Sequence, residues 1–151
     1  MARWLGIDHG TSRVGLAAGD DEGQVASPLG QLDASDPALA ERIADRAREY
    51  GVAGLVVGWP INDDGSEGRQ GRLAREFAVG LARATGMEVR LWDERLSSFE
   101  ADVRLRGRLT RRKKKRRHDA VAAAAFLEDF LSRRGPEKAP RASEAAPPEA
   151  T

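Results

Sequence analysis

One continuous apolar run limits the folds open to this chain of 151 residues. The run, AGLVVGWP, covers residues 53–60 and predicts a strand that is buried on both faces. Strands of this kind belong to sheets that helices cover on both sides. The length suggests one domain, and it is sufficient for a sizeable core without disulfides or structural metals.

The segments around this run predict the rest of the sheet and its helices. Residues 3–8 and 13–18 predict a strand hairpin closed by the turn HGTS, and residues 24–32 predict a weaker third strand. Strand patterns then alternate with helical ones, which is typical of a layered α/β domain with a mixed sheet. These later elements are helices that start at Asp36-Pro37 and cover 72–86, 99–106 and 118–134, and a strand over 87–92.

The first of these helices has the clearest local signals. Asp36 is a good N-cap, and Pro37 suits the first helical position. Leu39, Ile43 and Ala47 then recur at helical spacing. The pattern predicts a helix with one apolar face.

Charge is unevenly distributed, although the net charge is only +1. Residues 104–117, RLRGRLTRRKKKRR, hold ten of the 25 basic residues and no acidic one, and we expect them to form an exposed loop. The rest of the chain has 15 basic and 24 acidic residues, a balance of −9. Ten cations repel one another unless a polyanion binds them, so the run favours contact with nucleic-acid phosphates. A membrane surface and simple solvation are the alternatives.

Composition also limits where the protein works. The chain has no cysteine, which excludes disulfides and thiolate metal sites and agrees with a reducing cytosol. Residues 1–20 lack the pattern of a signal peptide, and no apolar stretch approaches the roughly 20 residues of a membrane span. We therefore expect a soluble, cytoplasmic protein with no membrane partner.

The last 17 residues differ from the rest. Residues 135–151 contain four of the seven prolines together with Ala, Glu, Arg and Ser, and they have few residues that could pack. Such a composition predicts a disordered tail. The predicted domain therefore covers residues 1–134.

Acidic residues stand at the carboxyl ends of two predicted strands. Asp8 follows RWLGI, Asp93 and Glu94 follow VRLW, and Asp119 begins the last helix. Sites of open α/β sheets gather at the carboxyl ends of strands, so these acids are candidates for one cluster. Clustered carboxylates repel unless hard cations such as Mg²⁺ or Mn²⁺ bind them. Two such cations about 3.5–4 Å apart can stabilise the attacking and leaving oxygens of a phosphodiester.

Each acid also has a plainer interpretation by itself. Asp8 can cap the turn, Asp93 or Glu94 can form a surface ion pair, and Asp119 can cap its helix. The roles of the two histidines stay open. The cluster requires that all three regions meet in space.

Four blocks of the chain carry a family resemblance that covers about residues 3–133, namely LGIDHGTSRVGLAAGD, GLVVGWPINDDGSEGRQ, LWDERLSSFEAD and RRKKKRRHDAVAAAAFLEDFL. They resemble the YqgF family, which is assigned to the maturation of 16S ribosomal RNA and is similar to RuvC-type Holliday junction resolvases. The resemblance implies an RNase H-like fold, in which a five-stranded mixed sheet, its first three strands antiparallel and the others parallel, is flanked by helices. It also implies a metal-dependent endonuclease that processes the 5′ end of pre-16S rRNA.

The resemblance assigns the acids as well. It places the catalytic and metal-binding carboxylates at Asp8, Glu94 and Asp119, gives Asp93 a supporting role, and implies Mg²⁺ or Mn²⁺ as cofactor. Family members more often have an aromatic residue where His9 stands. Hydroxyls and cations near the acids are expected to contact nucleic acid, namely Thr11, Ser12, Arg95, Ser97, Arg111, Arg112, Lys113, Lys114, Lys115, Arg116 and Arg117.

Other functions stay open at this level. A Holliday junction resolvase acting on DNA needs the same acids. A sugar-kinase or actin-like ATPase has a phosphate loop similar to GIDHGTSRVGLA, but it needs two such domains. A non-catalytic nucleic-acid or ribosome-binding factor fits the basic run and not the acids. The expected partners are pre-rRNA, structured DNA or the precursor of the small ribosomal subunit.

Overall fold

Five strands form one mixed sheet in the computed structural model, which describes residues 2–93 and 111–142 except for the side chains of 111–119. Their spatial order is β3-β2-β1-β4-β5. The first three strands pair antiparallel, whereas β4 is parallel to β1 and β5 is parallel to β4, as predicted. The strands are β1 (Arg3–His9), β2 (Arg13–Asp20), β3 (Ala26–Asp33), β4 (Gly54–Trp59) and β5 (Val89–Asp93).

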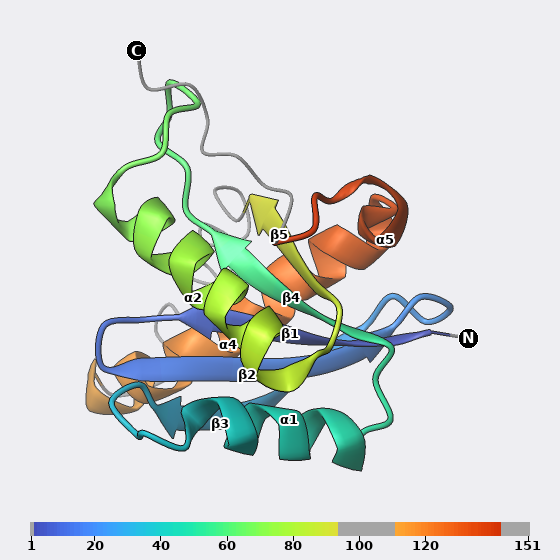
Figure 1. Cartoon of the computed structure of the whole chain (residues 1–151), viewed down its shortest axis with the longest axis horizontal. Helices are drawn as coiled ribbons and strands as arrows, with labels where there is room; N and C mark the ends of the chain where they lie inside the picture. The colour runs from blue at the N-terminus through green and yellow to red at the C-terminus, as the bar shows by residue number, and fades with distance from the viewer. Residues whose placement is uncertain (1, 94–110, 143–151) are drawn as a thin grey trace.

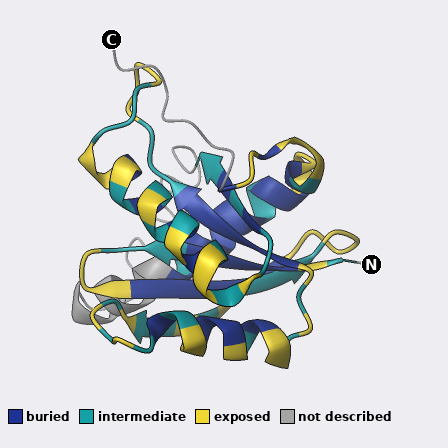
Figure 2. Cartoon of the chain, in the orientation of Figure 1, coloured by how far each residue is buried: buried dark blue, intermediate teal, exposed yellow. Residues whose placement is uncertain are grey.

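Helices cover both faces of this sheet. In Figure 1, α1 (Leu39–Glu49) and α2 (Arg69–Thr85) lie in front of the sheet, and α4 (Arg111–Ser132) lies behind it. The short helix α5 (Gly135–Lys138) follows α4. The middle parts of β1, β2 and β4 and the helix surfaces that face the sheet are buried, whereas the edge strand β3 is largely exposed or half-buried and the outer helix surfaces are exposed (Figure 2). Within the described ranges, no helix is long and apolar enough to cross a membrane.

Side-chain alternation along β1 divides the core into two layers. Leu5 and Ile7 belong to an aliphatic core with Ile43 of α1. Trp4 belongs to a second core with residues of α4, and a Cβ on Gly6 would meet the Cβ of Leu127 at 3.1 Å. One face of β1 therefore packs on α1 and α2, and the other packs on α4.

Helix α1 confirms the predicted apolar face, but the predicted start at Asp36-Pro37 is wrong by two residues, because Ala38 is the N-cap and the helix begins at Leu39. Leu39, Ile43 and Ala47 are buried on one side of the helix, as their spacing predicts. The Oδ1 atom of Asp36 accepts the backbone N–H of Ala38 at 2.8 Å, just before the helix begins.

The prediction that residues up to 117 form an exposed loop is wrong for 111–117, which form the first two turns of α4. Arginine and lysine are good helix formers, and a run of charge alone has no apolar period that would reveal a helix. The prediction of a largely buried helix further on is confirmed, because Ala120 and 122–127 are buried.

The prediction of a disordered tail from residue 135 is wrong for residues 135–142. After α5, the chain pairs with the edge of β5: the N–H of Leu91 donates to the carbonyl of Pro140 at 3.0 Å, and the N–H of Ala142 donates to the carbonyl of Val89 at 2.8 Å. Ala142 is buried. Composition does not predict that this segment is ordered, because small side chains and backbone hydrogen bonds to the open edge of β5 suffice to hold it. Residues 143–151, and the predicted helix 99–106, lie outside the described residues.

Candidate functional site

Three parallel strands end at one edge of the sheet, and Asp8 lies there. Ile7 pairs with Val57, and Val57 pairs with Leu91, so the strands are aligned. One residue further along, Asp8 stands on the face of the sheet that packs on α4. Gly58, which pairs with Trp92, is the corresponding residue of β4 and has no side chain there. Asp8 is half-buried.

The acid at the end of β5 lies on the other face. Val89 and Leu91 belong to the aliphatic core under α1 and α2, and alternation puts Asp93 on that same side. Trp92 instead donates its indole N–H to Asp129 of α4. Asp8 and Asp93 therefore point to opposite faces, so they are not placed to share one cation.

The packing of α4 on β1 shows which part of the helix approaches Asp8. Trp4 contacts Phe130, and two residues further along β1, Gly6 approaches Leu127 and Ala123. The helix therefore runs against the direction of the strand. Two more residues bring the strand to Asp8, about 7 Å beyond Gly6. One more helical turn, about 6 Å, brings α4 to residues 119 and 120.

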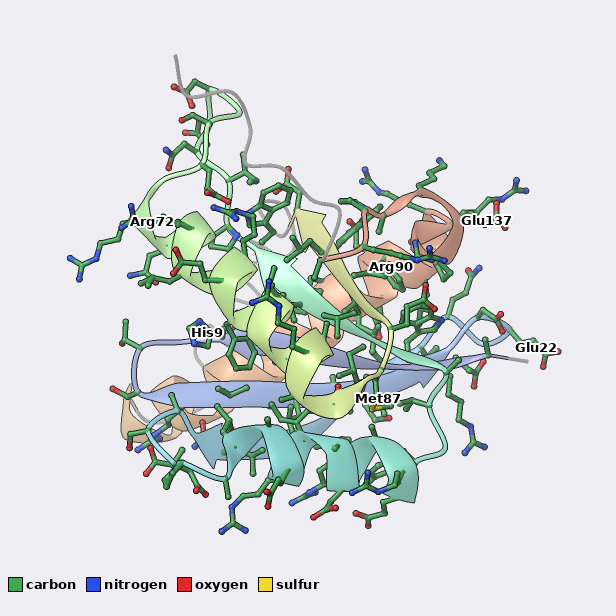
Figure 3. All side chains as sticks on the ribbon, viewed as in Figure 1. His9, Glu22, Arg72, Met87, Arg90 and Glu137 are labelled. Carbon is green, nitrogen blue, oxygen red and sulfur yellow. The ribbon has the colours of Figure 1, made fainter. Side chains whose placement is uncertain are left out.

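His9 fastens the end of β1 to α2. Its ring stacks on Phe77, with ring centroids 4.4 Å apart and planes inclined by 16°. Figure 3 shows His9 between the end of β1 and α2, on the face opposite α4. Burial lowers the pKa of His9 below its ordinary value of 6.5. The neutral ring is therefore favoured, which suits an aromatic stack.

The loop after β4 is held by a buried carboxylate that the sequence did not reveal. Glu67, whose side chain is 4% exposed, accepts the indole N–H of Trp59 at 2.9 Å. Arg75 donates to the same carboxylate from Nε at 2.9 Å and from Nη2 at 3.1 Å. The hydrogen bond with Glu67 raises the pKa of Arg75 above its ordinary value. No local pattern in the sequence reveals this carboxylate, because its partners lie eight residues away on either side.

Two predicted phosphate contacts lie in the β1–β2 turn at this same edge. Thr11 and Ser12 are exposed. The turn is closed by the N–H of Gly10, which donates to the carbonyl of Arg13 at 2.9 Å. The N–H of Ala34 donates to the carbonyl of Ser12 at 3.0 Å, which ties the turn to the end of β3. The turn backbone is thus fixed, while the Thr11 and Ser12 side chains face solvent.

The other predicted site residues are placed only in part. Asp119 and the basic residues 111–117 belong to α4, but their side chains lie outside the described residues. Glu94, Arg95 and Ser97 lie outside them entirely. Among the residues that the structure describes, no three His, Cys, Asp or Glu side chains form a group that could hold a metal ion. The three-acid site therefore stays a prediction.

Comparison with known proteins identifies the family. Residues 2–133 match the family model RuvX, described as a Holliday junction resolvase. The chain belongs to the RuvX family. A protein of Anaeromyxobacter sp. (strain Fw109-5), named "Putative pre-16S rRNA nuclease", is 48% identical over 134 residues, which cover 87% of this chain and 98% of the relative. A protein of Opitutus terrae with the same name is 41% identical, and the match covers 94% of this chain and 99% of the relative.

Solved structures show the same architecture. Thermus thermophilus RuvC in complex with a Holliday junction substrate matches with a TM-score of 0.57 and 18% identity, over 93% of this chain and 99% of RuvC. RuvC has an RNase H-like fold, so the predicted fold is confirmed. Membership of the RuvX family also confirms the prediction of an enzyme of the nuclease class.

Proposed function

We propose that this RuvX-family chain is a metal-dependent endonuclease that cleaves precursor 16S rRNA at its 5′ end. Asp8, Glu94 and Asp119 are the carboxylates that hold Mg²⁺ or Mn²⁺. The observation that carries the proposal is the position of Asp8, on the face of β1 that packs on α4 and beside the turn that contains residue 119. The relatives named for pre-16S rRNA support the choice of substrate.

The residues fit a hard divalent cation. Carboxylate oxygens are the ligands that Mg²⁺ and Mn²⁺ prefer. Position 119 lies seven residues before Phe126 and eleven before Phe130, so helical geometry places it on the side of α4 that packs on the sheet. Asp93 points to the opposite face, which leaves Glu94 as the acid that its block contributes. The bound cation supplies Lewis acidity for phosphodiester hydrolysis.

The chain itself binds and orients the nucleic acid. Seven consecutive basic residues open α4, and no acid stands in its first turn. The positive end of the helix dipole adds to their charge, and a polyanion relieves both. Because α4 runs opposite to β1, this cationic start lies toward the edge where Asp8, Thr11 and Ser12 stand. The basic side chains bind the phosphates of the nucleic acid. The hydroxyls of Thr11 and Ser12 donate to the sugar-phosphate backbone of the same nucleic-acid chain.

Cleavage of labelled RNA spanning the 16S 5′ leader tests this function. Wild type, Asp8→Asn and Asp119→Asn are compared with Mn²⁺, Mg²⁺ or EDTA, and Asp93→Asn serves as the matched acid on the opposite face. We expect metal-dependent cutting by wild type and Asp93→Asn, and at least about a 100-fold loss for the other two variants, because even outer-shell changes at metal sites cost 10- to 100-fold. Undiminished cutting by Asp8→Asn contradicts the proposal.

A Holliday junction is the second candidate substrate, which the description of the family model favours. A four-way DNA junction is therefore cleaved in parallel with the RNA. If the protein resolves the junction in preference to the RNA and needs a metal to do so, the substrate is a DNA junction, and the assignment of the three acids is unchanged. Tight binding of both nucleic acids without cutting under any metal favours a non-catalytic factor.

The salt dependence of RNA binding tests the basic start of α4. Changing Lys113, Lys114 and Lys115 to glutamine keeps good helix formers and removes three cations. Each lost phosphate contact reduces the slope of log K against log salt by about 0.7 for single strands. We expect a slope about 2 smaller, measured by fluorescence anisotropy in EDTA. An unchanged slope excludes these lysines from the interface.

A further inference from the structure

Three aromatic rings join β1, which carries Asp8, α4, which contains residue 119, and β5, which ends one residue before Glu94. Phe130 of α4 lies between two tryptophans, with ring centroids 5.1 Å from Trp4 of β1 and 5.6 Å from Trp92 of β5. Both contacts are edge-to-face, at 66° and 84°, which is a favoured geometry for aromatic pairs. We call Trp4, Phe130 and Trp92 the aromatic cluster.

One directional bond fixes β5 within this arrangement. The indole N–H of Trp92 donates to Oδ2 of Asp129 at 2.8 Å. The other oxygen of Asp129 pairs with Nε of Arg133 at 2.7 Å, which holds the carboxylate in place. By contrast, the indole nitrogen of Trp4 is buried without a hydrogen-bond partner among the described residues. Trp92 is thus the tryptophan of the cluster whose orientation a hydrogen bond sets.

The C-terminal segment closes the cluster from the other side. Gly135 packs so tightly on Phe130 that a Cβ there would lie 2.1 Å from the ring. Arg90 of β5 donates from Nη1 to the carbonyl of Ala139 at 2.7 Å, and Figure 3 shows Arg90 between β5 and the α5 end of the chain. Strand β5 is therefore fixed to both α4 and the segment that follows it.

We propose that Trp92 and Asp129 are positioning residues, which hold the end of β5 against α4 so that the acid following β5 in the sequence and the acid of α4 keep one separation. This inference rests on the proposed function. Along the chain, Glu94 follows Trp92 by two residues, and Asp119 precedes Asp129 by ten on one helix. Metal sites need their ligands held within about 0.5 Å, and packed, hydrogen-bonded support achieves this. Trp92–Asp129 is such a support between α4 and the strand that leads to Glu94.

Three variants of the pair separate positioning from simple stability. Trp92→Phe removes the indole N–H, and Asp129→Ala removes its acceptor. Asp129→Asn keeps an oxygen that can accept the same N–H. We expect the Mn²⁺ dissociation constant, measured by calorimetry, to rise about tenfold for the first two variants and to stay within about threefold of wild type for Asp129→Asn. RNA affinity in EDTA stays unchanged in all three.

Trp59→Phe is the matched control. It removes an indole–carboxylate bond of nearly equal length, 2.9 Å, but on the α1/α2 face of the sheet. We expect it to lower the urea midpoint of unfolding as much as Trp92→Phe does, while leaving Mn²⁺ affinity unchanged. If Trp92→Phe and Asp129→Ala bind Mn²⁺ like wild type, or if Trp59→Phe weakens Mn²⁺ equally, the positioning role is wrong. That failure is distinct from failure of the proposed function, in which Asp8→Asn also binds Mn²⁺ like wild type.

Discussion

The two faces of the sheet present different kinds of side chain to the helices that cover them. Toward α1 and α2, the strands present aliphatic side chains such as Leu5, Leu55 and Leu91, which are fully buried. Toward α4, the same strands present Trp4, Trp92, Val56, Gly6 and Asp8. Aliphatic burial stabilises without specifying direction, whereas aromatic edges, close backbone approach and an indole–carboxylate bond fix one element relative to another. The aliphatic face mainly stabilises the fold, and the α4 face also sets the geometry of the candidate site.

The last two residues of each parallel strand face opposite sides of the sheet. His9, Trp59 and Asp93 face α2, where a ring stack and a buried carboxylate hold the strand ends. Asp8 and Trp92 face α4. Two acids at the same edge thus belong to different environments, and only one of them can join an acid on α4.

The largest loss of stability is expected on the aliphatic face. Ile43→Ala empties a fully buried position of α1, and such changes cost about 2–5 kcal/mol. Urea unfolding measures this cost. Because the α4 face is untouched, the folded fraction should bind Mn²⁺ like wild type. A much weaker Mn²⁺ affinity of the folded protein would show that the two faces are not separable.

A smaller change on the α4 face should cost less stability but weaken Mn²⁺ binding. In Gly6→Ala, the new Cβ lies 3.1 Å from the Cβ of Leu127 and 3.2 Å from the carbonyl of Ala123, so α4 must shift. We expect a cost of about 1–3 kcal/mol together with weaker Mn²⁺ binding.

Gly80→Ala is the matched control for this prediction. Among the described residues, no atom outside the neighbouring helix backbone lies within 4 Å of the new Cβ in α2, so alanine should stabilise the helix by up to about 1 kcal/mol without changing Mn²⁺ affinity. Equal metal affinities of the two alanine variants contradict the role of the α4 packing.

Removal of the C-terminal segment should have a moderate effect. A chain that ends at residue 134 loses the pairing of Pro140 and Ala142 with β5, whereas one that ends at 142 keeps it. With a net value of about 1 kcal/mol for each hydrogen bond, partly offset by the entropy of the freed residues, we expect the first to be about 1–2 kcal/mol less stable than the second. Thermal unfolding of both chains measures the difference, and equal midpoints would show that the segment contributes nothing.

The smallest effect concerns pH. Burial raises the pKa of Glu88, but hydrogen bonds and attraction from Arg90 and Arg141 outweigh it and lower the pKa below the ordinary 4.5. A lowered carboxyl pKa contributes stability that is present above pH 4.5 and is lost as the pH falls through the folded-state pKa. The stability difference between wild type and Glu88→Gln should therefore be constant from pH 7 to about 5.5 and shrink below pH 4.5. A difference that grows on acidification contradicts this sign.

Much of the fold could be predicted from the sequence, because local patterns report it. The buried run at 53–60 and the alternating segments gave the class, and the spacing of Leu39, Ile43 and Ala47 gave the face of α1. The start of α4 at Arg111 could not be predicted, since cations surround the helix there without an apolar period. The pairing of 140–142 with β5 escaped because an open strand edge has no signature in composition.

The candidate site was predictable in part. Asp8 could be found because a strand delivers it into a turn. The resemblance chooses Glu94 over Asp93, but the physical reason lies in the side-chain alternation of β5, which is visible only once Val89 and Leu91 are seen in the aliphatic core. The hydrogen bond between Trp92 and Asp129 joins residues that are 37 positions apart, so no local sequence pattern predicts it.

Direct titration of Mn²⁺ tests the central claim that sidedness selects the metal-binding acids. Calorimetry on wild type, Asp8→Asn and Asp93→Asn needs neither RNA nor turnover. We expect Asp8→Asn to lose at least about 100-fold in affinity and Asp93→Asn to stay within about threefold of wild type. Equal losses in both variants, or a greater loss for Asp93→Asn, would contradict the assignment of the site to the α4 face.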